Sequence, residues 1–184
     1  MSKNATSSTL PPAFDHSDVH ARVYQALEEF RKRDLDLLYL RTNERTLCHR
    51  FAVYLEPLFP SWTVDCEYNR NLNRPKTLDR DGLDKTIPDV IIHRRNRPEN
   101  LCVFEVKKST HTPSTISRAR KLIELYVESV RTSYLPRYPN GAVIIFPIGD
   151  HDKLRCDWYH RGRGPRNVVG ISTCTEYPWI DSKQ

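Results

Sequence analysis

The sequence lacks long hydrophobic runs and closely spaced cysteines. None of its apolar stretches approaches the roughly 18 residues that a membrane-spanning helix needs. The first 16 residues, MSKNATSSTLPPAFDH, contain no apolar core of the kind found in secretory signal peptides. We therefore expect a cytoplasmic protein. The five cysteines are odd in number, widely spaced and free of any Cys-x-x-Cys pair, which predicts buried, reduced thiols rather than a disulfide or zinc framework.

Zinc-finger and helix-turn-helix signals are also missing, so the sequence gives no indication of base-specific recognition. What it does contain is an excess of positive charge, with 29 Lys and Arg against 23 Asp and Glu and a formal net charge of +6. This excess favours a polyanionic partner. A length of 184 residues suits one hydrophobic core. We expect a disordered tail over residues 1–16, which are rich in Ser, Thr and Pro, and a single domain over residues 17–184.

Two short apolar runs in the middle of the chain predict a β-hairpin. Residues 87–92 and 101–106 are separated by a polar segment that contains Pro98 and Asn100, which is typical of strand, turn and strand. Both runs are apolar on both faces, so we expect the hairpin to lie inside a sheet rather than at its edge.

The hairpin places two acidic residues opposite each other. If it is symmetric about Arg97, Asp89 pairs with Glu105, with their Cβ atoms roughly 5 Å apart. Lys107 then lies two residues farther along the same face. Two carboxylates that face each other in a half-buried environment destabilise the fold unless a positive charge lies between them. Mg²⁺ or Mn²⁺ is the natural candidate, because both prefer oxygen ligands.

Pro88-Asp89, followed by Glu105-Val106-Lys107, resembles the PD-(D/E)xK nuclease superfamily, and the resemblance extends over roughly residues 43–148. It implies an α/β protein with a restriction-endonuclease-like αβββαβ core. A mixed sheet would be flanked by helices, and an extra helix would precede the core.

The resemblance also implies an activity, namely magnesium-dependent hydrolysis of phosphodiester bonds by an endo- or exodeoxyribonuclease that binds DNA. The catalytic residues would be Asp89, Glu105 and Lys107. The metal ligands would be Asp89, Glu105 and the main-chain carbonyl of Val106, with an additional contact from Glu44.

Glu44 lies in the first turn of a predicted helix that runs from about residue 43 to residues 57–59. It precedes Leu47 by three residues and so projects from the buried side. An ordinary first-turn glutamate, favoured by the helix dipole, is the alternative to a metal contact. An earlier helix, with Ser17 or Asp18 as its N-cap, is predicted to extend to about residue 40 and to have a packing role.

The remaining elements follow from similar patterns. We expect a strand over residues 62–68, a helix opened by Thr112 and Pro113, and an interior strand over residues 142–148. A strand-helix-strand crossover makes this last strand parallel to that of Glu105. Residues 154–159 are predicted to add an edge strand.

Basic residues in a long polar loop and on the third helix are candidates for holding a phosphate backbone. A plain solvated loop and helix face is the alternative. The candidates are Arg70, Arg74, Lys76, Lys85, Arg118 and Lys121.

Two alternatives remain at the level of function. In the first, Asp89, Glu105 and Lys107 form only a salt-bridge cluster at a strand end. In the second, the protein is a non-catalytic nucleic-acid-binding or assembly module that keeps the fold without turnover. RNA instead of DNA as the substrate also stays open, as does a homodimer that would allow both strands to be cut.

Overall fold

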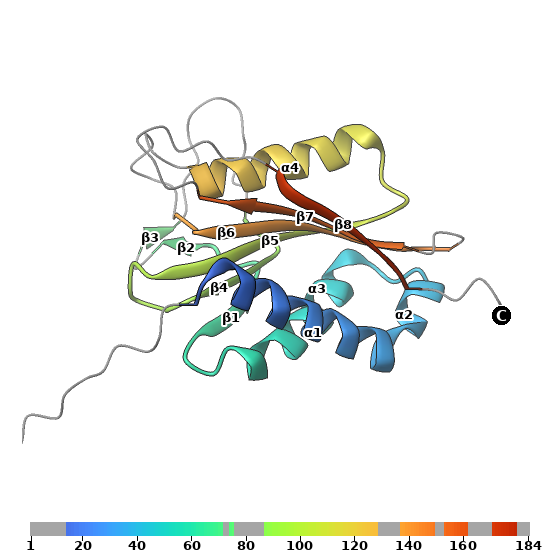
Figure 1. The fold of residues 1–184 in the computed structure, drawn as a ribbon, viewed down its shortest axis with the longest axis horizontal. Helices are drawn as coiled ribbons and strands as arrows, with labels where there is room; N and C mark the ends of the chain where they lie inside the picture. Colours follow the sequence, from blue (N-terminus) through green and yellow to red (C-terminus); the bar gives the residue numbers. More distant parts are fainter. Residues whose placement is uncertain are drawn as a thin grey trace, which may run out of the picture.

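A mixed six-stranded β-sheet forms the centre of the computed structural model, which describes residues 14–71, 74–75, 87–128, 137–149, 153–161 and 171–179 (Figure 1). The strands lie in the order β1-β4-β5-β6-β7-β8. Their bounds are β1 Thr63–Cys66, β4 Val90–His93, β5 Asn100–Lys108, β6 Asn140–Phe146, β7 Lys153–His160 and β8 Ile171–Pro178. A separate two-stranded sheet consists of β2 Arg70–Asn71 and β3 Arg74–Pro75.

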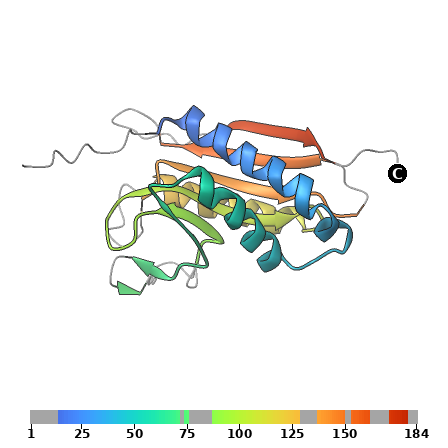
Figure 2. The same ribbon diagram turned by 90° about the horizontal axis from the view of Figure 1, so that it is seen from below.

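Helices cover both faces of the six-stranded sheet. α4 (Pro113–Glu128) lies on one face, and α1 (His16–Asp34) and α3 (Glu44–Leu55) lie on the other (Figures 1 and 2). Two short elements complete the described helices, α2 (Asp36–Tyr39) and the 3-10 helix η1 (Glu56–Leu58). The predicted α/β class, with a mixed sheet flanked by helices, is therefore confirmed.

The central strands β5 and β6 are buried on both sides. Phe104 and Ile144 belong to the core that packs against α1 and α3, whereas Val103 and Val143 belong to the core that packs against α4. β5 and β6 run parallel, with α4 between them in the chain, and the other neighbouring pairs of this sheet are antiparallel. Burial on both faces explains why the sequences of these two strands are continuously apolar. The parallel pairing across α4 is the crossover that the sequence predicted.

A glycine lets α4 approach the sheet closely. A Cβ atom added at Gly141 in β6 would lie 2.7 Å from Cγ2 of Ile123 and 2.9 Å from Cγ2 of Val127. Both distances are shorter than carbon atoms tolerate, so a larger residue would push the helix away.

The first helix begins and ends earlier than predicted. Its N-cap is Asp15, which forms a reciprocal capping box with Asp18, so neither Ser17 nor Asp18 is the cap. The helix ends at Asp34, and the separate helix α2 covers most of the remaining predicted length. Phe14 and Asp15, assigned to the tail, are therefore structured, while residues 1–13 lie outside the described part of the chain.

The predicted strands differ from the observed ones at several boundaries and in one edge assignment. β4 begins at Val90, and Ile87 lies outside it and is 39% exposed. β1 ends at Cys66, because the φ angle of +47° at Glu67 lies in the left-handed region that ends extended structure. β7 is not an edge strand, because β8 pairs with it.

The thiol prediction is only partly correct. Cys48, Cys102 and Cys156 are buried, but Cys66 is exposed at the end of β1. As for membrane spans, the helices within the described ranges include none with the length and apolar character to cross a bilayer.

Candidate active site

Asp89 is fixed against the end of β5 by a main-chain hydrogen bond. It directly precedes β4, whose register pairs Val90 with Phe104, and so continues opposite Glu105 as predicted. The amide nitrogen of Val106 donates to Asp89 Oδ2 at 2.7 Å. The aspartate is therefore held by the strand that carries the glutamate.

Lys107 lies at the centre of a cluster of oxygens. Its Nζ donates to Asp89 Oδ2 at 3.2 Å, to Glu105 Oε2 at 3.3 Å and to the main-chain oxygen of Val106 at 2.7 Å. The nearer carboxylate oxygen of Glu44 is 3.7 Å from the same nitrogen. One helix residue and four positions on or beside the hairpin thus converge at the C-terminal end of β5. All the predicted catalytic residues and metal ligands are among them.

Glu44 connects two layers at this point. Besides Lys107, it contacts His111 Nε2, which lies in the connection from β5 to α4. No local pattern identifies His111, because its pairing with Glu44 depends on how α3 and the β5–α4 connection meet in space.

Burial and charge shift two pKa values in the cluster. The side chain of Glu105 is 7% exposed. Its burial, with the nearby charge of Asp89, raises its pKa to about 8 despite the opposing effect of Lys107. Burial alone would lower the pKa of Lys107. The charges of Asp89, Glu105 and Glu44 outweigh this and raise it, so Lys107 stays protonated.

Glu105 differs from the three other buried residues of the described ranges that have a charged, amide or imidazole side chain. His93, Asn140 and Asp157 each have hydrogen-bond partners for their side chains. Oε1 of Glu105 is buried and has no partner. An unsatisfied buried acceptor costs about 1–3 kcal/mol, and more when it is charged, so a ligand at this oxygen would relieve a cost that the fold otherwise bears.

The chemistry of the cluster fits a hard divalent cation. Three carboxylates and one carbonyl oxygen form the kind of oxygen set that Mg²⁺ prefers. Within the described ranges, however, no three His, Cys, Asp or Glu side chains are already arranged to hold a metal ion. The contacts made by Lys107 Nζ also match the salt-bridge alternative.

The predicted phosphate contacts have different outcomes. Arg70 is exposed at β2, and Arg118 and Lys121 are exposed on α4. For Arg74 the structure describes only its position in β3, and Lys76 and Lys85 lie outside the described residues. The positions of these residues do not show whether they bind phosphate.

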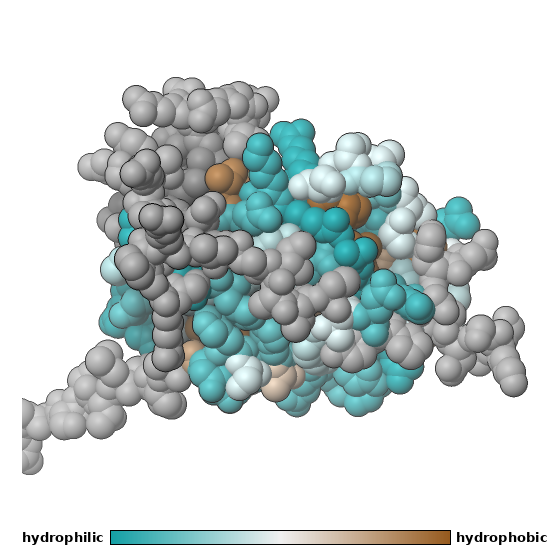
Figure 3. All heavy atoms as spheres, turned by 45° about the horizontal axis from the view of Figure 1, so that its top comes forward, coloured by the Kyte–Doolittle hydropathy of each residue, from teal (hydrophilic) through white to brown (hydrophobic). Residues whose placement is uncertain are grey.

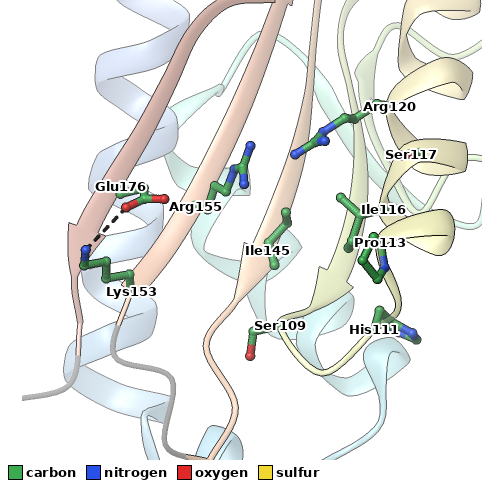
Figure 4. A pocket seen from close by; sticks show the side chains of 10 residues that line it. All are labelled: Ser109, His111, Pro113, Ile116, Ser117, Arg120, Ile145, Lys153, Arg155 and Glu176. Atoms are coloured by element: carbon green, nitrogen blue, oxygen red, sulfur yellow. Dashed lines mark hydrogen bonds and ion pairs between the residues drawn. The ribbon is translucent and has the colours of Figure 1, made fainter.

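A pocket of about 520 Å³ lies between α4 and strands β6 to β8 (Figure 4). Two arginines that the sequence analysis did not select, Arg120 and Arg155, line it, and both contact the fully buried Asp157. A charged residue placed among the apolar residues of a strand is the signal that could have identified Asp157. The pocket is also lined by Ser109, His111, Pro113, Ile116, Ser117, Ile145, Lys153 and Glu176.

Comparisons of the chain with protein-family models, curated proteins and solved structures gave no match. Function is therefore inferred below from the side chains and their arrangement.

Proposed function

We propose that this protein is a metal-dependent nuclease that hydrolyses phosphodiester bonds in DNA. The order α3, β1, β4, β5, α4, β6 corresponds to the αβββαβ core of the restriction-endonuclease-like fold, which we propose for residues 44–146. Asp89 directly before β4 and Glu105 on the neighbouring strand β5, with Lys107 two residues farther on, follow the order of the PD-(D/E)xK motif.

The observation that carries the proposal is the meeting of three carboxylates at one place, the end of β5, together with the unsatisfied Oε1 of Glu105. A cluster with three acids and one lysine has an excess of negative charge when all are ionised. A purely structural ion pair has no need of the second and third acids, since burying charges is costly.

The residues have separate roles in the proposed reaction. Asp89, Glu105 and the carbonyl oxygen of Val106 would hold Mg²⁺, and Glu44 would add a contact. When bound, the ion would lower the pKa of the attacking water and neutralise charge on the phosphate.

Lys107 would act as a hydrogen-bond donor rather than a base. The surrounding carboxylates raise its pKa and keep it an ammonium ion. It is therefore suited to orient the attacking water or to stabilise the negative charge that develops on the phosphate oxygens.

Charge and surface character support a nucleic-acid substrate. The chain has a formal charge of +6, and the described residues on the face shown in Figure 3 are mostly hydrophilic, with only small apolar spots. Such a surface suits a polar, negatively charged partner.

The experiment is a cleavage assay with single-stranded DNA, duplex DNA and RNA in Mg²⁺, Mn²⁺ or EDTA. We expect the wild type to cleave DNA only with a divalent ion, and Asp89→Asn and Lys107→Met to lose at least about 100-fold in rate. The first change would weaken the binding of the metal ion, and the second would remove a positive charge that acts on the reacting phosphate. Arg33→Gln, a change at an exposed side chain on α1, is the matched control. Equal rates for all four proteins would eliminate the assignment.

A non-catalytic binding module is the second candidate. It is favoured by the contacts of Lys107 Nζ, which already bridge the carboxylates without a metal ion. Such a protein would bind nucleic acid with the same affinity in EDTA and in Mg²⁺ and would cleave neither DNA nor RNA.

A further inference from the structure

The chain leaves α2 through a backbone conformation that arginine rarely adopts. Arg41 has a φ angle of +52°, in the left-handed region. Its amide nitrogen donates to the carbonyl oxygen of Leu38 at 3.2 Å, and that of Thr42 donates to the carbonyl oxygen of Leu37 at 3.1 Å. This pair of hydrogen bonds is a common way to end a helix, and glycine is the usual residue at the left-handed position. The fold therefore bears a strain at Arg41 that a glycine would relieve.

The guanidinium of Arg41 lies over a glycine and is unpaired within the described part of the chain. A Cβ atom added at Gly149, which follows β6, would lie 3.2 Å from Nη2 and 3.8 Å from Cζ of Arg41. The missing side chain at residue 149 thus makes room for the guanidinium. None of the described residues forms a hydrogen bond or an ion pair with this exposed side chain. Its donors can therefore bind a ligand, and a guanidinium fork matches the oxygens of a phosphate group.

Two large apolar side chains are exposed in the same turn. Tyr39 is 52% exposed and Leu40 is 71% exposed, whereas Leu38 beside them is fully buried and anchors the turn in the core. The other exposed large apolar residues of the described ranges, Val53 and Ile87, are single and only 39% exposed. An aromatic ring beside a cation suits a single-stranded nucleic acid, because a base stacks on the ring while the cation contacts the backbone.

The turn lies at the end of the sheet where the chain passes from β5 to α4 (Figure 1), which is also the place of the candidate active site. The carbonyl oxygen of Thr42 accepts from Nζ of Lys108, the neighbour of Lys107, at 3.3 Å. Arg41 precedes Glu44 by three residues, so their Cα atoms are at most about 11 Å apart. A nucleic-acid strand covers this interval in about three nucleotides, at about 3.4 Å of axis per phosphate.

We propose that residues 39–42 bind one nucleotide of the substrate strand a few nucleotides from the bond that is cleaved. The guanidinium of Arg41 holds its phosphate, and the ring of Tyr39 stacks on its base. This inference rests on the proposed nuclease function for the identity of the ligand. Because Leu38 and Gly149 fix the position of the turn, the bound nucleotide would set the register of the strand and so select which phosphodiester reaches Lys107.

The phosphate contact is tested without cleavage, by fluorescence anisotropy of a labelled single-stranded DNA in EDTA at several salt concentrations. We expect Arg41→Gln to weaken binding about tenfold, because it removes charge-assisted hydrogen bonds to phosphate. It should also reduce the slope of log K against log[salt] by about 0.7. Arg41→Gly should weaken binding to the same extent without lowering the thermal unfolding midpoint, since glycine relieves the left-handed strain.

Arg97→Gln is the matched control for the loss of charge. Arg97 is exposed in the turn between β4 and β5, at the opposite end of β5 from Lys107. Its variant should therefore bind DNA as the wild type does. Arg41 variants within twofold of the wild type, or an equal loss of affinity in Arg97→Gln, would overturn the proposal.

The base contact is tested with two DNAs of equal length, one with normal nucleosides and one made of abasic sites. We expect Tyr39→Ala to weaken binding of the first at least about fivefold, the effect of losing one base stack, and to leave binding of the second unchanged. Tyr39→Phe, which keeps the ring, should bind both as the wild type does. So should Val53→Ala, which shortens an exposed apolar side chain on α3. Equal effects of Tyr39→Ala on the two DNAs would overturn the base contact.

The failure of this proposal can be distinguished from the failure of the proposed function. Weakened binding by the Arg41 variants of a protein that cleaves nothing supports the nucleotide site while rejecting the nuclease. Cleavage by the wild type, with unaltered binding by the variants, does the opposite.

Discussion

The clusters around Lys107 and around Asp157 are built alike but have opposite charge. In the first, one lysine is bound by three acidic side chains. In the second, one aspartate is bound by two arginines. Each central ion is more deeply buried than most of its partners, and each cluster has an excess of the partners' charge. The comparison teaches that each buried ion is held by more than one partner of opposite charge, so removing the central ion leaves all of its partners without their counter-charge.

The largest effect on stability is expected from Asp157→Ala. This change removes the counter-charge of two arginines together with two hydrogen bonds between charged groups, each of which contributes up to about 1.5–3 kcal/mol. Urea denaturation would show it as a lower midpoint. Glu29→Ala removes an acid on the surface that contacts two basic residues on α1, and it should cost much less, because surface ion pairs contribute little to stability. Similar losses for the two variants would contradict the central role of Asp157.

A smaller loss of stability is expected from Gly141→Ala. The added methyl group meets Ile123 and Val127 of α4, and overpacking of this kind costs about 1–3 kcal/mol. Thermal unfolding would measure the loss, and an unchanged midpoint would contradict the close approach of α4 to β6.

Glu105→Gln should remove the proposed nuclease activity but stabilise the protein by about 1–2 kcal/mol near neutral pH in the absence of metal ions, since a glutamine, unlike Glu105, does not have to take up a proton to be buried without a charge. The pKa of Glu105 is raised from 4.5 to about 8 in the folded state. Its contribution to stability is therefore fully present below about pH 4.5 and lost as the pH rises through about 8. The variant should be less sensitive than the wild type to pH between these values in urea denaturation with EDTA. Identical pH profiles of stability for Glu105→Gln and the wild type would contradict the raised pKa of Glu105.

The smallest effect is expected at His20, where the pH dependence has the opposite direction. His20 stacks on Trp158, with ring centroids 3.7 Å apart, and lies beside His160. Burial, followed by the charge of His16, lowers its pKa from 6.5 to about 4. The resulting stability is present above about pH 6.5 and is lost as the pH falls through about 4. His20→Phe should make the thermal unfolding midpoint less sensitive to acid between pH 4 and 7. An unchanged dependence of the midpoint on pH would contradict the lowered pKa of His20.

The sequence predicted the elements near the acidic cluster well because their evidence is local. The apolar runs on both sides of Arg97 determine the register that brings Asp89 opposite Glu105, and three observed pairs of β4 and β5 follow that register. Asn43 caps α3 and so fixes Glu44 in its first turn. Such signals lie within a few residues of the side chains that they position.

The basic cluster could not be predicted in the same way. Arg120 and Asp157 are 37 residues apart in sequence, and their contact depends on the distance between α4 and β7. Periodicity assigned Arg118 and Lys121 to the exposed face of the helix correctly, but it gave no means of finding the partner of Arg120. The boundaries of α1 and β1 were wrong for smaller reasons, a capping box and a single residue with positive φ.

The parallel pairing of β5 with β6 affects the order in which the protein folds. A hairpin such as β4–β5 closes over a short turn, but β6 reaches β5 only after the chain has passed through α4. Closing this longer loop costs more conformational entropy and slows folding. Asp89 and Glu105 can therefore meet early on the hairpin, whereas Arg120 meets Asp157 only after the helix docks. A nascent chain would acquire its acidic cluster first and its basic cluster last.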